Sequence, residues 1–432
     1  MRVLIAAHGF PPTHYAGAER LAERIASQLA SQGHAIEVFA VERLDDLNFR
    51  VETEQSRGFP VHRVYYNAGT TAPYPGSYDS PQVARAVEQV LERSRFDVIH
   101  IISGYLIAVP VIRAARHAKT PVVITLTEYW FMCSRLNLLR FGQVLCSGPE
   151  SDYKCAHCLA EEKRRYRLIS RTSPQIASLL GKTPSFRRLE SALRSRREKL
   201  QQTLAAADVV VSPSQFLIDK FAEFGFNTER FVLIRHGLPA ADTSRTSANH
   251  IQSETLRLGY TGQIKPHKGV DLVVDAVLPL LDAGHNITLD LWGPDDEDPA
   301  YTAALKRRTA GYPSVRWRGR YDRRELWTIL ASIDTLVIPS RWYENSPMVI
   351  WEAYMAGLPV VATRLGGMAE IVTHEQSGLL FNLNDAADLR HQIERLITEP
   401  DLLPRLRAGI PPVRTETEEV SEILSQYQRL LR

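Results

Sequence analysis

Residues 335–372 read TLVIPSRWYENSPMVIWEAYMAGLPVVATRLGGMAEIV, with two short apolar runs on either side of a helical pattern. The runs at 335–339 and 358–363 are short and clearly bounded, which predicts two buried strands of a parallel sheet. The pair Gly366-Gly367 ends the second run before another helix start. Strands alternating with helices in this way predict an α/β fold.

The helix between the two strands has a readable start and stop. Ser346 suits the N-cap, Pro347 suits the first helical position, and Gly357 suits the left-handed residue after the last turn. Two carboxylates flank the start. Glu344 precedes it in the loop, and Glu352 follows about a turn and a half into the helix.

This helix start has a chemical use. The free backbone N–H groups near residues 347–349 and the positive end of the helix dipole predict an anion site. A carboxylate beside such a site can accept hydrogen bonds from a sugar diol, as an acidic residue does in dinucleotide-binding folds. A phosphate at the helix tip with a sugar diol alongside describes a nucleotide-sugar. A capped surface helix with two ordinary glutamates is the alternative.

The surrounding sequence resembles the donor-site signature of the family 4 glycosyltransferases. The resemblance rests on Glu344-Asn-Ser-Pro, Glu352-Ala, Ala356-Gly-Leu-Pro-Val-Val-Ala-Thr, Gly366-Gly367 and Glu370. It covers nearly the whole chain and implies a retaining enzyme with two Rossmann-like α/β domains facing across a cleft, the GT-B architecture. Glu344 would contact hydroxyls of the donor sugar and Glu352 the ribose. The resemblance assigns the nucleotide also to Asn345, Ser346, Pro347, Met348 and Val349.

Length and composition agree with a globular enzyme. The 432 residues suit two or three domains, with 44% hydrophobic and 23% charged residues. The net charge of +3 is too small to indicate nucleic acid by itself. No apolar run approaches the roughly 18 residues of a membrane span, and the first residues are too short for a signal-peptide core. Four cysteines in so long a chain do not form a disulfide scaffold, so we expect a cytoplasmic enzyme.

The first half begins with a predicted strand at residues 3–7, a loop, and a helix at 18–32. Relatives usually carry a Gly-Gly pair in this loop, whose backbone approaches the donor diphosphate. This chain has Ala16-Gly17, so the resemblance assigns only Gly17 to that role, followed by the matching Glu19. An ordinary tight turn is the alternative.

Ligands of doubly wound sheets collect outside the carboxyl ends of the strands, which singles out His8, Ser103-Gly104 and Thr127-Glu128. Relatives often carry a histidine at position 127, thought to contact the 6-hydroxyl of the sugar. Thr127 can still hydrogen-bond a hydroxyl, although it does not titrate near neutral pH. Thr127 and Glu128 are the catalytic candidates of the first half.

The second half has its own phosphate loop, Gly262-Gln-Ile-Lys-Pro-His-Lys-Gly269. The resemblance implies that Lys268 clamps the diphosphate and, with the helix dipole, neutralises the leaving group in place of a magnesium ion. Gln263 stands where relatives often have arginine, and Lys265 can offset that loss of charge. Gly293 and Tyr321 end two further strands and would lie near the base.

All four cysteines lie within 26 residues, at Cys133, Cys146, Cys155 and Cys158. Cys155 and Cys158 have the C-x2-C spacing of a metal knuckle, and the other two thiols can complete a tetrahedral site. A structural zinc ion is the leading hypothesis. An iron–sulfur cluster, a redox pair and four free thiols are the alternatives. The cluster resembles an insert in one branch of family 4, near the acceptor cleft.

Residues 163–199 contain twelve Lys or Arg and two Glu, interleaved with apolar residues that include Ile176, Leu179 and Leu180. This pattern predicts a basic amphipathic hairpin that contacts an anionic membrane surface or a phosphorylated lipid. Two solvated helices are the alternative. Nucleic acid is not indicated, since no DNA-binding motif accompanies the charge.

The sequence thus predicts an acceptor domain at 1–236 with an insert at 131–200, a donor domain at 237–415, and a terminal helix at 416–432 that crosses back to the first domain. A polar linker is expected at 241–255. The predicted function is retaining, metal-independent transfer from a UDP- or GDP-sugar to a glycan or lipid-linked acceptor, in polysaccharide or glycoconjugate synthesis. The enzyme would be cytoplasmic or peripheral on the inner face of the membrane. A nucleotide-sugar 2-epimerase and a non-catalytic, metal-bound scaffold are the alternatives.

Overall fold

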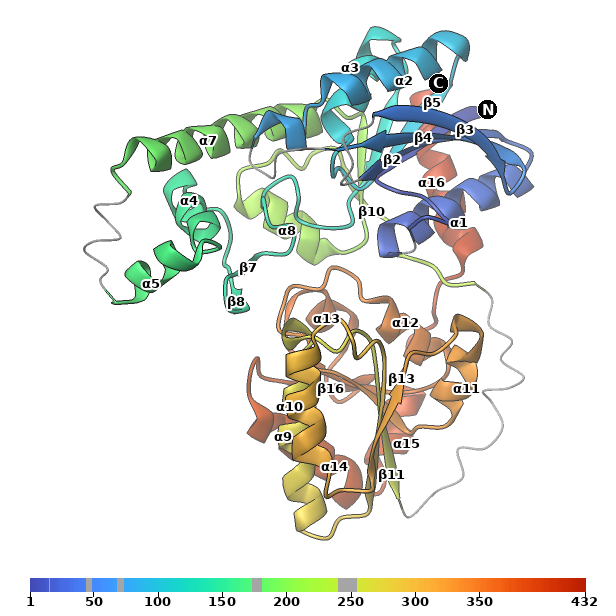
Figure 1. Ribbon diagram of the computed structural model, residues 1–432. Helices are drawn as coiled ribbons and strands as arrows, with labels where there is room; N and C mark the ends of the chain where they lie inside the picture. The colour runs from blue at the N-terminus through green and yellow to red at the C-terminus, as the bar shows by residue number, and fades with distance from the viewer. Residues whose placement is uncertain (15, 44–48, 68–73, 173–180, 240–254) are drawn as a thin grey trace. The chain divides into compact units, whose positions relative to one another are not determined.

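The computed structural model describes residues 1–14, 16–43, 49–67, 74–172, 181–239 and 255–432. The chain divides into two compact units, one formed by Met1–Arg235 with Glu416–Arg432 and the other by His236–Thr415 (Figure 1). The C-terminal helix therefore belongs to the first unit. Of the expected linker, only Thr255 falls within the described residues.

The first unit is built on a mainly parallel sheet with the strand order β10-β9-β6-β5-β1-β2-β4-β3 among the described residues. Only β3 runs antiparallel, against β4. The strands are β1 (Arg2–Ala7), β2 (Ala35–Arg43), β3 (Arg50–Ser56), β4 (Phe59–Tyr66), β5 (Val98–Ile102), β6 (Val122–Thr125), β9 (Val209–Ser212) and β10 (Phe231–Leu233). The helices around this sheet are α1 (Gly17–Ser31), α2 (Pro81–Arg93), α3 (Ala108–His117), α8 (Gln215–Glu223) and α16 (Glu416–Leu430), with the short η1 (Pro75–Ser77).

Both faces of this sheet are covered, which explains its strongly apolar strands. Alternate residues of β1, such as Val3 and Ile5, share one core with α1 and α16. Leu4, on the opposite face of β1, is also fully buried. Figure 1 shows α1 and α16 together on one side of the sheet and α2 and α3 on the other.

His100 on β5 ties α16 to the sheet. Its Nδ1 lies 2.5 Å from the hydroxyl of Tyr427, and its Nε2 lies 2.7 Å from the hydroxyl of Thr125. Burial lowers the pKa of His100 to about 3, although the charge of Glu419 opposes the shift. The unfolded chain has a histidine pKa of about 6.5. The stabilisation by neutral His100 is therefore complete above that pH and is lost as the pH falls from about 6.5 to about 3.

We expect this histidine to make the first unit sensitive to acid. Between pH 7 and pH 5 the wild-type protein should lose about 2 kcal/mol of stability through His100, whereas His100→Gln should not lose this share. Urea unfolding of both proteins at pH 7 and pH 5 measures this loss. The difference in unfolding free energy between wild type and His100→Gln should be smaller at pH 5 by about 2 kcal/mol. A constant difference would show that His100 does not titrate in this range.

The predicted insert is a region of the first unit with small elements of its own. It contains β7 (Leu139–Arg140), β8 (Val144–Leu145), α4 (Asp152–Ala160), α5 (Arg164–Thr172) and α7 (Pro184–Ala205). Thr183 caps α7, with Pro184 at its first position. A small core joins α4 to α7 through Ala156, Phe186 and Leu193. Ile176, Leu179 and Leu180 of the expected hairpin lie outside the described residues.

The second unit is built on a parallel sheet with the strand order β13-β12-β11-β14-β15-β16. The strands are β11 (Leu256–Thr261), β12 (Ile287–Trp292), β13 (Val315–Gly319), β14 (Thr335–Ile338), β15 (Val360–Thr363) and β16 (Gly378–Phe381). The helices are α9 (Val270–Asp282), α10 (Pro299–Thr309), α11 (Leu326–Ala331), α12 (Met348–Met355), α13 (Gly366–Ile371), α14 (Ala386–Thr398) and α15 (Leu402–Ala408), with the short η3 (Pro266–Lys268) and η4 (Arg323–Glu325).

This second sheet is also buried on both faces. Val337 of β14 belongs to a core with α9 and α14, whereas Leu336 and Ile338 belong to a core with α11, α12 and α13. The predicted doubly wound α/β architecture is therefore confirmed for each unit.

The helix start after β14 differs by one residue from the prediction. Pro347, with extended backbone angles, is the N-cap, and the helix begins at Met348. Ser346 does not cap this helix, and its hydroxyl instead accepts a hydrogen bond from Trp351 Nε1 at 3.2 Å. The predicted stop is confirmed, since Gly357 has a φ of +70°.

Candidate functional site

Glu344 and Lys268 meet in the second unit at the carboxyl ends of β14 and β11. Lys268 Nζ lies 2.7 Å from Glu344 Oε1, which also accepts hydrogen bonds from Ser340 Oγ at 2.9 Å and Trp342 Nε1 at 2.7 Å. The Lys268 ammonium also lies 4.9 Å from the centre of the Trp342 ring. The sequence identified Glu344 and Lys268 but missed Ser340 and Trp342, which form this cluster with them.

The cluster holds Glu344 ionised although the side chain is only 14% exposed. Burial by itself raises the pKa of Glu344. The charge of Lys268 and the hydrogen bonds from Lys268, Ser340 and Trp342 outweigh burial and leave the pKa below its ordinary value. The site therefore presents a charged carboxylate beside a fixed ammonium group.

Two glycines bring the loops of this site into backbone contact. Gly269 has a φ of +73°, and a Cβ there would stand 2.0 Å from the carbonyl oxygen of Pro339. A Cβ at Gly367 would stand 1.9 Å from the carbonyl oxygen of Asn345, and the Gly367 N–H donates to Glu344 O at 2.8 Å. The loop that carries Glu344 is thus clamped between the starts of α9 and α13.

Glu352 lies on the first turns of α12 and is only 2% exposed. Its carboxylate forms an ion pair with Arg323, from η4. Sequence reasoning missed Arg323, because no local pattern links a residue of η4 to a helix 29 positions further along the chain.

Residues 345–349 lie at the N-terminus of α12, as expected for the predicted anion site. Pro347 is buried, whereas Asn345, Ser346, Met348 and Val349 are partly exposed. The Ile350 N–H donates to Pro347 O at 3.0 Å, whereas the N–H groups of Met348 and Val349 precede the first hydrogen bond of the helix.

Gln263 and Lys265 follow β11, and both contact Glu297. No sequence pattern had indicated Glu297 as part of this site. Gln263 Nε2 donates to Glu297 Oε2 at 2.9 Å, and Lys265 Nζ lies 2.7 Å from the same oxygen. Next to them, the Gly262 N–H donates to Trp292 O at 3.0 Å. The turns after β11 and β12 are therefore joined to each other at the carboxyl edge of the sheet.

Gly293 extends this edge to β13. Its N–H donates to Gly319 O at 2.8 Å, and its φ of +152° allows its backbone to approach Gly262. Tyr321 follows β13 and packs on the core that contains α11 and α12. The two residues expected near the base thus follow neighbouring strands.

Asp296-Glu297-Asp298 has the Asp-x-Asp spacing of metal-dependent nucleotide-sugar sites, but both aspartates have structural partners. Asp298 Oδ1 accepts the Tyr301 N–H at 3.1 Å and caps α10. Asp296 Oδ1 accepts a hydrogen bond from Arg320 at 2.6 Å.

A second polar cluster lies in the first unit, at the carboxyl ends of β5 and β6. Glu128 accepts hydrogen bonds from Ser103 Oγ, at 2.9 Å, and from the hydroxyl of Thr127. Burial raises the pKa of Glu128, against the effect of both hydrogen bonds. Ser103 is fully buried with a φ of +63°, a strained backbone that often marks a functional site.

His8 and Glu19 lie beside this cluster, at the carboxyl end of β1 and in the first turn of α1. His8 Nε2 lies 3.6 Å from Glu19 Oε1. Glu19 Oε2 and His8 Nδ1 are buried and have no hydrogen-bond partner among the described residues. Buried polar atoms of this kind call for a partner, and a ligand hydroxyl can supply one to each of them.

Gly17 is the first residue of α1, one position before the predicted helix start. A Cβ at Gly17 would meet no atom of the described residues within 4 Å. The packing of the chain itself therefore does not require glycine here, and the space above its backbone is open.

The zinc site is not confirmed. Within the described parts of the chain, no group of three or more His, Cys, Asp or Glu side chains could hold a metal ion as these side chains lie. The four cysteines do line a common pocket with Leu138, Arg140 and other residues of the insert.

Comparison with protein families identifies the class of this protein. Residues 16–237 match the family described as "Glycosyl transferase 4-like domain", and residues 255–399 match "Glycosyl transferases group 1". The first match alone spans more than half of the chain. The chain therefore belongs to the family 4 glycosyltransferases.

Two relatives show how far the sequence similarity extends. Glycogen synthase of Mycobacterium tuberculosis is 30% identical over 197 residues, which are 45% of this chain and 46% of that protein. D-inositol 3-phosphate glycosyltransferase of Streptomyces bingchenggensis is 26% identical over 225 residues, or 48% and 49%. The chain spans about half the length of the curated relatives it matches.

Solved structures share the fold over the full length. HepE of Anabaena, in complex with UDP, matches with a TM-score of 0.66 at 17% identity and covers 99% of this chain and 100% of its own. Sucrose-phosphate synthase of Thermosynechococcus elongatus matches with a TM-score of 0.62 at 16% identity, over 100% and 99%. The chain therefore has the two-domain GT-B fold.

Proposed function

We propose that this protein is a retaining glycosyltransferase that moves a sugar from a UDP- or GDP-sugar to a glycan or lipid-linked acceptor, in polysaccharide or glycoconjugate synthesis. The observation that carries the proposal is the Glu344–Lys268 pair beside the open N-terminus of α12. A charged carboxylate for sugar hydroxyls, an ammonium group and free N–H groups for phosphate stand together there.

The chemistry follows from these positions. Lys268 and the N-terminus of α12 would stabilise the negative charge that develops on the leaving diphosphate. Glu344 would hold the sugar hydroxyls, and Glu352 the ribose. In a retaining transfer the leaving phosphate helps to remove the acceptor proton on the same face, so the protein mainly positions the reactants. This role for Lys268 requires no catalytic metal ion, and the aspartates of the Asp-x-Asp segment cap α10 and pair with Arg320.

The acceptor side of the proposal rests on the first unit. Glu19 Oε2 and His8 Nδ1 have no hydrogen-bond partner among the described residues. Next to them, Glu128 accepts hydrogen bonds from the hydroxyl groups of Ser103 and Thr127. Burial together with the charge of His14 lowers the pKa of His8 to about 4, so its ring is neutral at physiological pH. A neutral imidazole and carboxylates are suited to several hydroxyl groups of a sugar acceptor.

Incubation with UDP-, GDP- and ADP-sugars tests the function and its rivals. Release of nucleoside diphosphate that increases with a glycan or lipid-linked acceptor is expected. Conversion of the donor sugar to its 2-epimer without an acceptor would identify an epimerase. No binding of any nucleoside diphosphate in calorimetry would favour the non-catalytic scaffold.

Glu352→Gln tests the ribose contact. The variant keeps the size of the side chain but loses the charge that strengthens hydrogen bonds to a diol. We expect binding of the nucleoside diphosphate to weaken by about 1.5–3 kcal/mol, as measured by titration calorimetry. Arg323→Gln is the matched variant, because it removes the ion-pair partner of Glu352 but keeps the carboxylate. Unchanged affinity in Glu352→Gln would remove this residue from the site.

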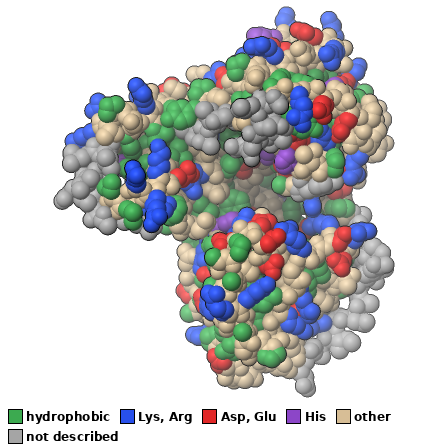
Figure 2. All heavy atoms as spheres, in the orientation of Figure 1, with side chains coloured by type: hydrophobic (Ala, Val, Ile, Leu, Met, Phe, Trp, Pro, Cys, Tyr) green, Lys and Arg blue, Asp and Glu red, His purple; other side chains and the backbone are tan. Residues whose placement is uncertain are grey.

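The proposed location is the cytoplasmic face of a membrane, through the basic surface formed by α5 and the first turns of α7. Exposed basic residues of this surface are Lys163, Arg164, Arg165, Lys182, Arg187 and Arg188. Leu168 between them is 56% exposed. Figure 2 shows Lys and Arg side chains next to hydrophobic ones over this region. This composition suits an anionic lipid surface.

No helix among the described residues is long and apolar enough to cross the bilayer. Co-sedimentation with phosphatidylglycerol vesicles, compared with phosphatidylcholine vesicles, tests the surface contact. Equal recovery with both lipids would contradict it.

A further inference from the structure

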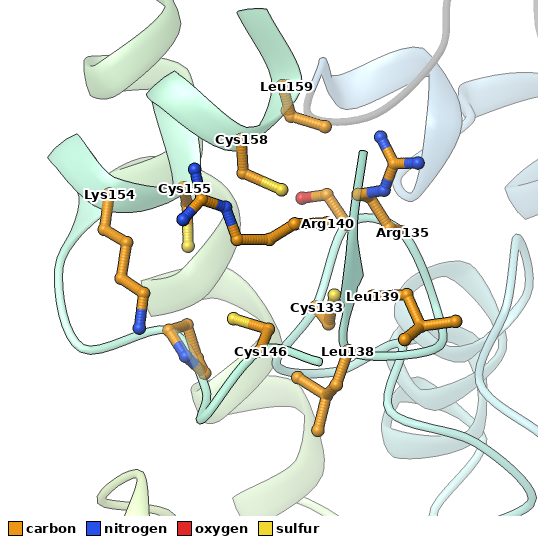
Figure 3. A pocket seen from close by; sticks show the side chains of 12 residues that line it. Cys133, Arg135, Leu138, Leu139, Arg140, Cys146, Lys154, Cys155, Cys158 and Leu159 are labelled. Atoms are coloured by element: carbon orange, nitrogen blue, oxygen red, sulfur yellow. The ribbon is translucent and has the colours of Figure 1, made fainter. Parts of the chain in front are cut away.

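The four cysteines come from separate segments and line one pocket in the insert. Cys133 follows the buried Trp130, Cys146 follows β8, and Cys155 and Cys158 lie one turn apart on α4. In Figure 3 their sulfur atoms surround a common space. Cys155 interacts electrostatically with each of the other three thiols, and Cys158 interacts with Cys133 and Cys146. We propose that this pocket binds one zinc ion through four thiolates, as a structural site separate from the chemistry of sugar transfer.

A buried arginine next to the pocket supports an anionic occupant. Arg196 of α7 is only 2% exposed, and no carboxylate of the described residues forms an ion pair with it. It donates to Trp130 O at 2.5 Å, lies 5.0 Å from the Trp130 ring, and interacts electrostatically with Cys133 and Cys155. A buried charge normally requires a balancing charge. A zinc ion with four thiolates has a net charge of −2 and supplies it.

The loop that carries Cys133 is already shaped around its sulfur atom. Burial raises the pKa of the Cys133 thiol, and hydrogen bonds from the backbone N–H groups of Arg135 and Leu138 to its sulfur oppose this shift. Leu136 and Leu138 have φ values of +69° and +53°. Two non-glycine residues in this strained region within three positions indicate a ligand clamp rather than a relaxed turn. Hydrogen bonds of this type orient and stabilise metal-bound ligands.

A zinc site explains the four-cysteine pocket and the buried Arg196 better than a redox pair of cysteines or an empty pocket does. A redox pair needs only two cysteines, whereas four line this pocket. As the side chains lie, no three of the thiols form a ligand set in the described part of the insert. Binding therefore requires rotation of cysteine side chains between staggered positions, which leaves the backbone in place.

The proposed ion would link the loop after β6 to the insert. Thr127 and Glu128 precede Cys133 in this loop, while Arg196 joins the same loop to α7. A zinc ion would then fix the position of the Glu128 cluster through the backbone. It would have no open coordination position and would not take part in the transfer itself.

Elemental analysis of the full chain, purified without added metal, is the first test. We expect about one zinc ion per chain. Replacement by Co²⁺ should give the intense near-ultraviolet thiolate-to-cobalt absorption and the visible bands of a tetrahedral site. In the native protein the thiols should react slowly with a thiol reagent and become reactive when a chelator removes the metal. These measurements use the wild-type protein and do not depend on its activity.

Cys155→Ser combined with Cys158→Ser should lose at least nine-tenths of the bound zinc and lower the unfolding temperature. Binding of nucleoside diphosphate to the second unit should be retained. Ser134→Ala is the matched control, because Ser134 lines the same pocket beside Cys133 without a thiol, and its zinc content should be unchanged. Wild-type protein without metal, without a cobalt spectrum and with four rapidly reacting thiols would overturn the proposal. A brown chromophore with iron would overturn the assignment to zinc.

Discussion

Lys268→Ala is expected to slow the release of nucleoside diphosphate from the donor by about 100-fold, the usual effect of removing one preorganised electrostatic group. The ammonium group is held in place by Glu344 at 2.7 Å and by the Trp342 ring. Gly269 directly follows it and fixes the turn against the carbonyl of Pro339. A charge positioned in this way loses little free energy to reorganisation when charge develops on the leaving phosphate.

The loss should appear mainly in kcat, because the interaction strengthens as the bond to the phosphate breaks. Lys306→Ala is the matched control, since Lys306 of α10 pairs with the partly exposed Asp295 and its loss should leave the rate within twofold of wild type. Circular dichroism must show both variants folded. A folded Lys268→Ala protein with wild-type turnover would assign the diphosphate to another cation, such as Lys265.

The fold could be predicted from sequence because its signals are local. Buried parallel strands are short apolar runs, and many of them are followed by a glycine or a helix cap within a few residues. Ser214 caps α8 directly after a strand, and Gly357 ends α12 in the predicted left-handed conformation. The edge strand β3 was not predicted, because its residues are mostly exposed and polar and it depends on pairing with β4.

The candidate donor site could be predicted where its residues lie in recognisable local motifs, as Glu344, Glu352 and Lys268 do. Glu344 and Glu352 are separated by a loop and one helix turn, so the chain itself fixes their spacing. Arg323 and Glu297 could not be found, since each reaches its partner from a distant part of the chain. Arg323 contacts Glu352 across the reversal of strand order between β11 and β14, and Glu297, after β12, contacts side chains after the neighbouring strand β11. Glu297 pairs with the ammonium group of Lys265 and accepts a hydrogen bond from the amide of Gln263. No local sequence pattern indicated these two contacts.

The loop at the carboxyl end of β1 depends on a buried ion pair that the sequence did not reveal. Arg63 of β4 and Glu42 of β2 have side chains that are 2% and 0% exposed, and they contact each other directly. Arg63 also donates to Phe10 O at 2.9 Å and to Pro11 O at 2.7 Å, while His14 Nδ1 lies 2.5 Å from Glu42 Oε2. The charged pair therefore holds the loop from His8 to His14 against the sheet.

Arg63→Met should destabilise the first unit by about 3–5 kcal/mol, because it removes the buried cation beside Glu42, leaves the partly exposed His14 beside that carboxylate, and frees two backbone carbonyls. Combining it with Glu42→Leu should cost clearly less than the sum of the two single changes, since the double variant buries no unpaired charge. Arg320→Met is the control. It breaks an ion pair whose side chains are 62% and 66% exposed and should cost no more than about 1 kcal/mol. Urea unfolding, with hydrogen exchange of peptides from β1, β2 and β4, measures the first unit separately. If the losses in unfolding free energy of the two single variants add up to that of the double variant, Arg63 and Glu42 stabilise the fold independently. Each would then act through its contacts with the backbone loop and not through the ion pair.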